Sequence, residues 1–182
     1  MRIGLVCPYS LATPGGVQNH VLGLAGWLKA QGHTPVILAP GDISAAALAR
    51  RGLAPREVTS LGRTIGVRWN GSVARVAGGP LTAWRVHRWL TRHQLDVLHI
   101  HEPVTPSAGL WALLWSNCPT VVTFHLATRR SRLLHLAGRV LQPWLRRIDR
   151  SLAVSPVAAT VVREHLGLEP DIVANGIDIH EF

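Results

Sequence analysis

The sequence is poor in cysteine, lysine and acidic residues, and each shortage narrows what the protein can be. Its 182 residues include two cysteines, Cys7 and Cys118, which lie in apolar stretches without CxxC spacing. This placement favours reduced core thiols of a cytosolic protein over a disulfide or a zinc site. A chain of this length suits one substantial domain with its own core and is short for two.

Long hydrophobic runs are also missing. The apolar segment Ile3–Cys7 stops at Pro8, which makes it too short for the core of a signal peptide. Residues 103–128 contain no Asp, Glu, Lys or Arg, but prolines such as Pro106 and Pro119 divide them into a helix of ordinary length and a short strand. We therefore expect neither a targeting peptide nor a membrane span.

The charge is strongly basic and unevenly placed. Nineteen Lys and Arg residues face ten Asp and Glu residues, and all but one of the basic residues are arginine. Arg85, Arg88 and Arg92 form one cluster, and residues 129–150 hold a second. Arginine binds phosphate with a planar fork, so an anionic membrane, a phosphorylated substrate or a nucleic acid are the candidate partners. A general preference for arginine would explain the missing lysines but not the clustering. Nucleic acid is not expected, because no reading helix or aromatic platform is evident.

Short apolar segments alternate with longer amphipathic ones along the chain. The predicted strands are Ile3–Cys7, Thr34–Leu38, Asp96–Ile100, Thr120–Phe124, Ser151–Val154 and Ile172–Val173. The predicted helices are Gly16–Gln31, Ser44–Arg51, Leu81–Arg92, Ser107–Ser116, Ser131–Arg146 and Pro156–Leu166. Because the strands are continuous apolar runs without alternation, helices should cover both faces of the sheet. The pattern predicts an α/β fold with a doubly wound, Rossmann-like parallel sheet.

The most informative motif is PGGVQNH at residues 14–20, between the first predicted strand and the first helix. Glycines at such a turn let the backbone approach a ligand, and the first N–H groups of the helix favour negative charge. The motif therefore suits a phosphate or diphosphate, although paired glycines also make plain tight turns. Two further segments, Glu102–Pro106 and His125–Ser131, also follow strands, so we expect all three to line one crevice at the carboxyl ends of the strands.

The stretch Gly62–Gly79 interrupts the alternation and has Asn70-Gly71 near its centre. Asn-Gly is a strong signal for a β-hairpin turn, which is the simplest interpretation. An excursion of this kind, flanked by arginines, is also where a substrate-binding loop is found.

Taken in order, these motifs resemble a known family. PGGVQNH at 14–20, DVLHIHEP at 96–103, TFH at 123–125, VS at 154–155 and NGID at 175–178 resemble the amino-terminal half of family 4 retaining glycosyltransferases with the GT-B fold. More narrowly, CPYS at 7–10, NGSVAR at 70–75 and HIHEP at 99–103 are similar to actinobacterial phosphatidyl-myo-inositol mannosyltransferases. One departure is Leu126-Ala127-Thr128, where such relatives carry Thr or Ser directly after the histidine.

The resemblance implies a role for several residues. Gly15 and Gly16 would lie at the donor diphosphate, and His125 would contact the donor sugar as a catalytic residue, although a histidine there could also be a satisfied core residue. The positions implied for the inositol phosphate of the acceptor are Tyr9, Gln18, Asn70, Ser72 and Arg75. Residues 1–174 would form the acceptor-binding domain, and 175–182 would begin the connection to a donor domain that this chain lacks.

His99 and His101 allow a second interpretation. Alternate residues of a strand point to the same face, and metal hydrolases use this spacing. Such a site needs further ligands at later strand ends, and His125 alone is available. The alternative is that His99 packs in the core while His101 and Glu102 shape the floor of the crevice. No Asp-x-Asp pair is present to hold a metal on a diphosphate, so we expect no metal and no cofactor.

The segment Leu81–Arg92 combines Trp84 and Trp89 with the basic cluster. Basic and aromatic residues on a short helix suit an anionic bilayer, and the resemblance implies membrane docking there. A solvated helix with its tryptophans in the core is the alternative.

The resemblance implies half of a retaining mannosyltransferase that moves mannose from GDP-mannose to phosphatidyl-myo-inositol. Its expected place is the cytoplasm, peripheral on the inner face of the plasma membrane. Without the donor half, we expect little or no sugar transfer. A family 4 enzyme with a soluble acceptor such as inositol phosphate is the alternative, followed by a non-catalytic module that binds phosphate or nucleic acid.

Overall fold

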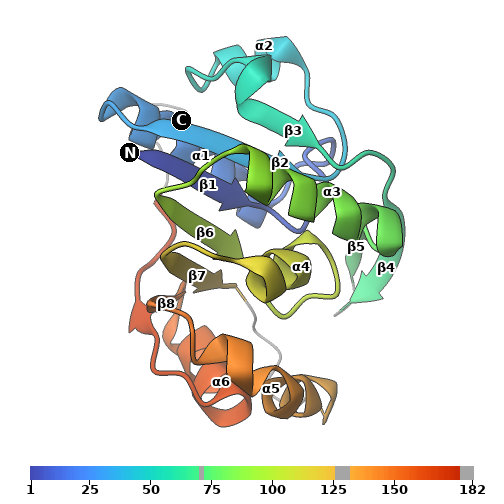
Figure 1. The fold of residues 1–182 in the computed structure, drawn as a ribbon, viewed down its shortest axis with the longest axis vertical. Coiled ribbons are helices and arrows are strands. Elements are labelled where there is room, and N and C mark those ends of the chain that lie inside the picture. The colour runs from blue at the N-terminus through green and yellow to red at the C-terminus, as the bar shows by residue number, and fades with distance from the viewer. Residues whose placement is uncertain (70–71, 126–131, 177–182) are drawn as a thin grey trace.

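The computed structural model describes residues 1–69, 72–125 and 132–176, drawn in Figure 1. In chain order the elements are β1 (Arg2–Val6), α1 (Gly16–Ala30), β2 (Thr34–Ala39), α2 (Ala45–Ala49), a 3-10 turn (Pro55–Glu57), β3 (Val58–Ser60), β4 (Ile65–Trp69), β5 (Ser72–Val76), α3 (Pro80–Arg92), β6 (Val97–His101), α4 (Ala108–Trp115), β7 (Thr120–Phe124), α5 (Arg132–Leu145), β8 (Arg150–Ala153), α6 (Pro156–Leu166) and β9 (Asp171–Ile172).

A parallel sheet organises the molecule. Its strands lie in the order β3-β2-β1-β6-β7-β8-β9, and every neighbouring pair runs parallel. The direction of winding reverses between β1 and β6, which pair directly from Ile3↔Val97 to Val6↔Ile100. In doubly wound sheets such a reversal opens a crevice at the carboxyl ends of the two strands, and ligands bind there.

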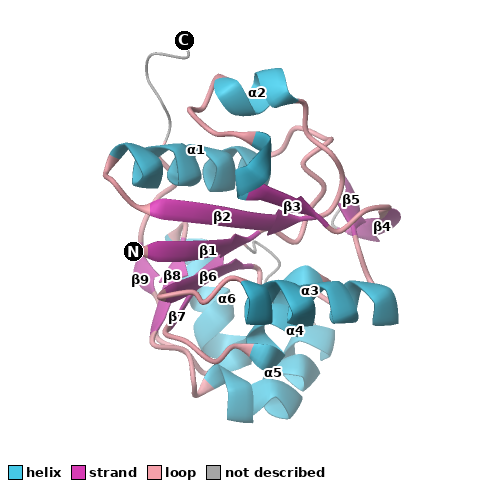
Figure 2. Cartoon of the chain, turned by 45° about the horizontal axis from the view of Figure 1, so that its top comes forward, coloured by secondary structure: helices cyan, strands magenta, loops and turns pink. Residues whose placement is uncertain are grey.

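Helices cover both faces of the sheet, as the apolar strands predicted. In Figure 2, α1 and α2 lie on one face, and α3, α4, α5 and α6 lie on the other. Each layer has its own core: Leu5, Val21 and Ile37 belong to the first, and Leu98, Ile100 and Phe124 to the second. The predicted Rossmann-like α/β fold is therefore confirmed.

Close packing of α3 on β1 depends on a glycine. A Cβ at Gly4 would lie 2.9 Å from the Trp89 ring and closer still to Leu95. A larger residue would have to displace these two side chains, because a core at crystal-like density has little room to spare. This contact fixes the helix that carries the first basic cluster.

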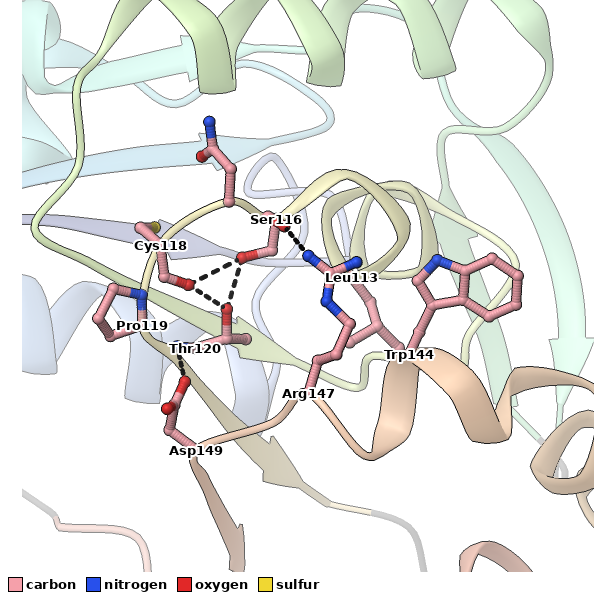
Figure 3. Close-up of a pocket in the computed structure, with 9 residues that line it drawn as sticks. Leu113, Ser116, Cys118, Pro119, Thr120, Trp144, Arg147 and Asp149 are labelled. Carbon is pink, nitrogen blue, oxygen red and sulfur yellow. Dashed lines mark hydrogen bonds between the residues drawn. The ribbon is translucent and has the colours of Figure 1, made fainter.

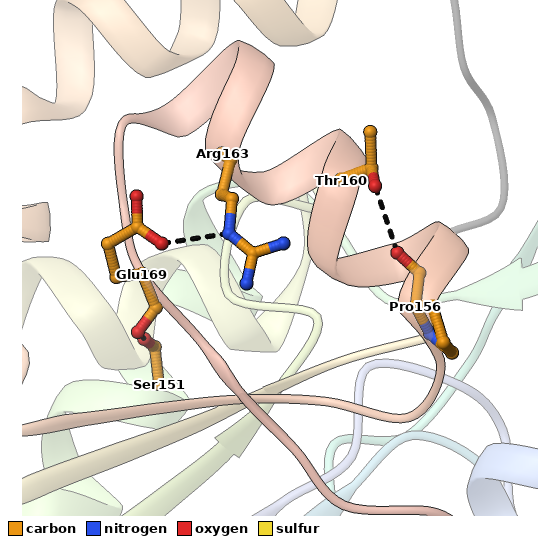
Figure 4. A network of polar contacts seen from close by, with 5 residues as sticks. All are labelled: Ser151, Pro156, Thr160, Arg163 and Glu169. Atoms are coloured by element: carbon orange, nitrogen blue, oxygen red, sulfur yellow. Dashed lines mark hydrogen bonds and ion pairs between the residues drawn. The ribbon is translucent and has the colours of Figure 1, made fainter.

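Local sequence sets the helix ends. Ser44 and Ser155 each cap a helix, accepting from the N–H of Ala47 and Ala158 respectively. Gly167 ends α6 in the left-handed conformation, at φ 65°. Figure 4 shows how the end of α6 is tied down beyond that point: Arg163 Nε lies 2.8 Å from Glu169 Oε2, and the Ser151 hydroxyl donates to the Glu169 carbonyl.

The predicted strands and helices are all present, with ends shifted by one or two residues. The stretch Gly62–Gly79 contains the antiparallel hairpin of β4 and β5, as its Asn-Gly pair predicted, and the turn residues 70–71 lie outside the described part. The sequence did not predict β3, a three-residue edge strand that lacks an apolar run.

Cys7 is buried and Cys118 half-buried, and both are free thiols. None of the described helices is long and apolar enough to span a bilayer.

Candidate active site

Three strand ends meet at the point where the winding reverses. Tyr9 follows β1, Glu102 follows β6, and His125 follows β7, at the same edge of the sheet. The Glu102 carboxylate accepts a hydrogen bond from the main-chain N–H of His125. Burial raises the pKa of the Tyr9 phenol, and the nearby Glu102 carboxylate raises it further. The predicted convergence of these loops is therefore present, although residues 126–131 of the third loop lie outside the described part.

The β4–β5 hairpin docks on the loop after β1. Tyr9 forms an isolated antiparallel bridge with Val76, and the N–H of Ser10 donates to the carbonyl of Arg75 at 2.9 Å. Arg75 is exposed, and its main chain is thereby held beside Tyr9. Of the other hairpin residues predicted to bind the acceptor, Asn70 lies outside the described residues and Ser72 is placed by its main chain alone.

Gln18 closes the glycine turn from inside. Its amide Nε2 donates to the carbonyls of Ser10 and Thr13, at 3.2 and 3.1 Å. Its Oε1 lies 2.4 Å from where a Cβ of Gly15 would be, so this position must be glycine for Gln18 to sit there. Gly16 begins α1 with open space at its Cβ position. Gln18 is thus primarily a brace for the loop, and its oxygen is the atom left to accept from a ligand.

Imidazoles crowd the floor of the crevice. His101 Nδ1 lies 3.2 Å from His125 Nε2, and the His20 ring on α1 meets both of these rings edge-on, with centroids 5.4 and 5.6 Å away. His99 stacks on His101 at 4.4 Å and is held by a 2.7 Å hydrogen bond between its Nε2 and the Thr123 hydroxyl. His125 therefore belongs to a connected group of rings and is not an isolated side chain.

Burial keeps these rings neutral. It lowers the pKa of His99 and of His125 to about 4, with neighbouring imidazoles adding to the effect. The pKa of His101 lies well below its usual range for the same reason, and that of His20 is also lowered. A neutral imidazole can both donate and accept a hydrogen bond, whereas a charged one can only donate.

Glu102 is the acidic group of the crevice. It is fully buried, and its backbone adopts φ 53°, a left-handed conformation that is costly for a residue with a side chain. Burial raises the pKa of its carboxyl to about 7, although the hydrogen bond from His125 acts in the opposite direction. Among the described residues its Oε2 has no hydrogen-bond partner. A strained, buried carboxyl at a strand end is a frequent mark of a functional site.

A cavity of about 230 Å³ lies beside the glycine turn. Thr13, Pro14, Gln18 and Asn19 line one side of it, and Arg50 and Arg51 from the end of α2 line the other. The sequence analysis did not select either arginine. They lie more than thirty residues after the glycine motif in a segment with no motif of its own, so tertiary packing alone reveals them.

A second cavity, of about 360 Å³, lies at the opposite end of the sheet, where β7 begins (Figure 3). Arg147 donates to the Ser116 carbonyl, Thr120 N–H donates to Asp149, and the Ser116 and Thr120 hydroxyls are hydrogen-bonded. These polar groups bond to one another. Arg147, one arginine of the second basic cluster, therefore lies at the amino ends of the strands, opposite the crevice.

Helix α3 carries the first basic cluster on a partly apolar surface. Arg88 lies over the Trp84 ring at 5.4 Å, and Arg92 is exposed in the last turn. Arg85 instead donates to the carbonyl of Leu61, so it anchors the chain after β3. Between α3 and α4 lies a groove of about 600 Å³ lined by Gly79, Pro80, Ala83, Trp84, His87, Trp111 and Trp115.

In the part of the chain that the structure describes, His99 and His101 both contact other protein groups. Within the described ranges, no three His, Cys, Asp or Glu side chains are arranged to hold a metal ion. His99 Nε2 is bonded to Thr123, and His101 Nδ1 faces His125. The two histidines of the HxH motif are thus engaged with protein groups.

Comparison with known proteins agrees with this geometry. The model of Glycosyltransferase Family 4 matches residues 14–181. The chain belongs to this family. Family 4 glycosyltransferases thus include a member with the crowded histidines and the braced glycine turn described above.

Curated relatives match along the whole chain. A phosphatidyl-myo-inositol mannosyltransferase of Propionibacterium freudenreichii is 48% identical over 182 residues, which are 100% of this chain and 48% of the relative. The protein of the same name from Mycobacterium leprae is 42% identical over 181 residues, 98% of this chain and 46% of the relative. The chain spans about half the length of the curated relatives it matches.

Solved structures share the fold at low identity. The Anabaena protein Alr3699/HepE in complex with UDP-glucose superposes with a TM-score of 0.60 at 19% identity, covering 99% of this chain and 45% of that one. MurG of Acinetobacter baumannii gives a TM-score of 0.56 at 18% identity, covering 97% and 46%. These likenesses concern the fold alone, which is that of a GT-B glycosyltransferase domain.

Proposed function

We propose that this chain is the acceptor-binding half of a retaining mannosyltransferase that transfers mannose from GDP-mannose to phosphatidyl-myo-inositol. The observation that carries the proposal is the 48% identity over all 182 residues with a phosphatidyl-myo-inositol mannosyltransferase. The crevice adds independent support, because its glycine turn, imidazoles and hairpin arginine belong to one connected set of loops.

The acceptor site is assigned to the loop after β1 and the hairpin docked on it. Arg75 would grip the inositol phosphate, since a guanidinium binds phosphate bidentately. Tyr9 and the oxygen of Gln18 would take ring hydroxyls, together with Asn70 and Ser72. The hydrogen bond from Ser10 to Arg75 supports this assignment because it holds the hairpin against the loop.

The donor site is assigned to the glycine turn and His125. Helix α1, all of which is described, has no side-chain cap at Gly15 and no acidic residue in its first turn, so its first N–H groups suit a diphosphate. His125 would bond the donor sugar. In the proposed transfer the bond from the anomeric carbon to the diphosphate breaks, an inositol hydroxyl bonds to that carbon on the same face, and the hydroxyl proton leaves with the diphosphate. No cofactor is required.

The lipid is assigned to α3 and the groove beside it. Trp84 and Trp115 are 53% and 37% exposed and line the same groove, so apolar ring surface is open there. Arg88 and Arg92 flank them with positive charge. Basic residues next to apolar rings suit an anionic leaflet, so the enzyme would work peripherally on the cytoplasmic face of the plasma membrane.

The first test is a sedimentation assay with vesicles. The 182-residue chain is mixed with phosphatidylcholine vesicles that contain either phosphatidylinositol or the same fraction of phosphatidylglycerol. We expect tighter binding to phosphatidylinositol and a loss of that preference, about tenfold or more, in Arg75→Gln. Arg63→Gln, which removes an equally exposed charge nearby, is the matched control.

The competing functions give different results in the same assay. Equal binding to both vesicles would remove phosphatidylinositol as the acceptor. Displacement by inositol phosphate without any vesicle binding would favour a soluble acceptor, and displacement by DNA would favour a nucleic-acid module. Transfer itself is measured with labelled GDP-mannose on the chain joined to the carboxyl-terminal half of the Propionibacterium relative, with the anomeric configuration of the product read by NMR.

A further inference from the structure

The two nitrogens of His101 have unequal surroundings. Its Nδ1 lies 3.2 Å from Nε2 of His125. Its Nε2 is buried and has no hydrogen-bond partner in the part of the chain that the structure describes. The ring is fully buried, so it is neutral and carries one proton, on one nitrogen or the other.

The cost of an unpaired group decides where that proton lies. A buried N–H without an acceptor is rare in proteins, whereas an acceptor that lacks a donor is tolerated more often. The proton of His101 therefore belongs on Nδ1, where it can donate to His125. The alternative would bury an N–H at Nε2 with nothing to receive it.

This assignment fixes the neighbouring ring as well. If Nδ1 of His101 donates, then Nε2 of His125 accepts and carries no proton. The single proton of a neutral His125 is then on its Nδ1, the nitrogen that the His101 contact leaves for a ligand. Which nitrogen of a histidine is protonated is generally set by the hydrogen bond that the other one makes.

We infer that His101 is a positioning residue that fixes His125 in its Nδ1–H tautomer, so that His125 offers a hydrogen-bond donor to the substrate. The His99 ring stacks on His101 at 4.4 Å but makes its own hydrogen bond to the Thr123 hydroxyl, so it takes no part in the bond between His101 and His125. Glu102 holds the main chain of His125 from the other side.

The role of this donor depends on the proposed function, but the tautomer does not. In sugar transfer from a nucleotide donor, an N–H at this position would bond an oxygen of the donor sugar. It would act as a fixed dipole toward the developing charge and not as a base that removes a proton.

The test is NMR of the chain labelled with 15N in its histidines. The two nitrogens of a neutral imidazole have well separated 15N shifts, so the protonated one is identified directly. We expect the His125 signal of the unchanged chain to show Nδ1–H. An Nε2–H pattern in the unchanged chain would overturn the inference without any variant.

Variants of His101 test its role. His101→Leu fills a similar volume without a donor and should move His125 to Nε2–H, the usual form of a free side chain. His101→Asn places an amide N–H near the position of Nδ1 and should restore Nδ1–H. In the control His99→Leu, which removes a ring of the group but no bond to His125, the tautomer should stay unchanged. If His125 keeps Nδ1–H in a folded His101→Leu chain, His101 does not set it.

Failure of this inference is separable from failure of the proposed function. Loss of the phosphatidylinositol preference leaves the tautomer assignment standing. Conversely, the wrong tautomer leaves the vesicle result standing.

Discussion

The carboxylate of Glu102 accepts a hydrogen bond from the main-chain N–H of His125, 23 residues later in the chain. The bond crosses from the end of β6 to the end of β7, and Glu102 reaches it from a left-handed backbone conformation. Each strand end is thereby held by the other, which keeps His125 beside His101.

Replacing Glu102 separates its hydrogen bond from its charge. Glu102→Gln keeps an oxygen that accepts the His125 N–H, so we expect it to fold with stability close to the unchanged chain. Glu102→Ala leaves that N–H buried without a partner and should lower the free energy of unfolding by about 1–3 kcal/mol. Urea denaturation at pH 5 measures both, because Glu102 is then neutral in the folded chain and its ionisation in the unfolded chain adds little. Equal losses in the two variants would show that the hydrogen bond is not what matters.

Acid should destabilise the chain through its buried histidines. His99 and His125 titrate near pH 4 when folded and near 6.5 when unfolded, so the unfolded state binds more protons between these values. The contribution of these histidines to the free energy of unfolding should be constant above about pH 6.5. It should fall as the pH drops toward 4, by on the order of 1–3 kcal/mol for each group. The midpoint of urea unfolding, followed from pH 8 to pH 4, measures this.

The pH dependence that Glu102 gives to stability has the opposite sign, so Glu102 provides an internal check. Its carboxyl titrates near 7 when folded against 4.5 when unfolded, so it is the folded state that holds the extra proton in this range. Its contribution to the free energy of unfolding therefore decreases as the pH rises from 4.5 to 7. Glu102→Gln should therefore lose stability more steeply than the unchanged chain as the pH falls from 7 to 4.5. If the stability of both proteins does not change with pH, His99, His125 and Glu102 are not buried as described.

The glycine turn is tested by a double-mutant cycle. Gly15→Ala would displace the Gln18 amide and break its bonds to Ser10 and Thr13, with a loss of about 1–2 kcal/mol. In a Gln18→Ala background the same change should cost much less, because the clash is gone. Gly16→Ala has open space and should be neutral or slightly stabilising. If the losses of stability from Gly15→Ala and Gln18→Ala are additive, Gln18 does not brace the glycine turn.

Membrane docking is tested with two tryptophans of similar exposure. Trp84 on α3 is 53% exposed and Trp27 on α1 is 59% exposed, on opposite layers of the sheet. Trp84→Ala should weaken sedimentation with anionic vesicles several-fold, whereas Trp27→Ala should not. Neutralising Arg88 and Arg92 together should weaken it further, by about 1 kcal/mol for each arginine. Arg85 is better left in place, since it holds the Leu61 carbonyl.

The elements of the fold were predictable where hydrophobicity has a clear period. The continuous apolar runs of β1, β2 and β7 predicted a sheet covered on both faces, and the alternation of strand and helix predicted its parallel winding. Edge strand β3 was not predictable, because its three residues are exposed or only half-buried and need no apolar pattern.

The site was predictable only in part, for a related reason. His125 and the glycine turn each follow a strand, so topology placed them together in advance. Arg50 comes from another element and no local pattern marks it. The double role of Gln18 as loop brace was likewise invisible, because it depends on where the carbonyls of Ser10 and Thr13 point once the loop is closed.

The crowded rings of His20, His99, His101 and His125 carry no charge of their own near neutral pH. A ligand that binds at this edge of the sheet therefore meets N–H dipoles and no positive charge from these rings. Through these imidazoles, its affinity should not change with pH near neutrality.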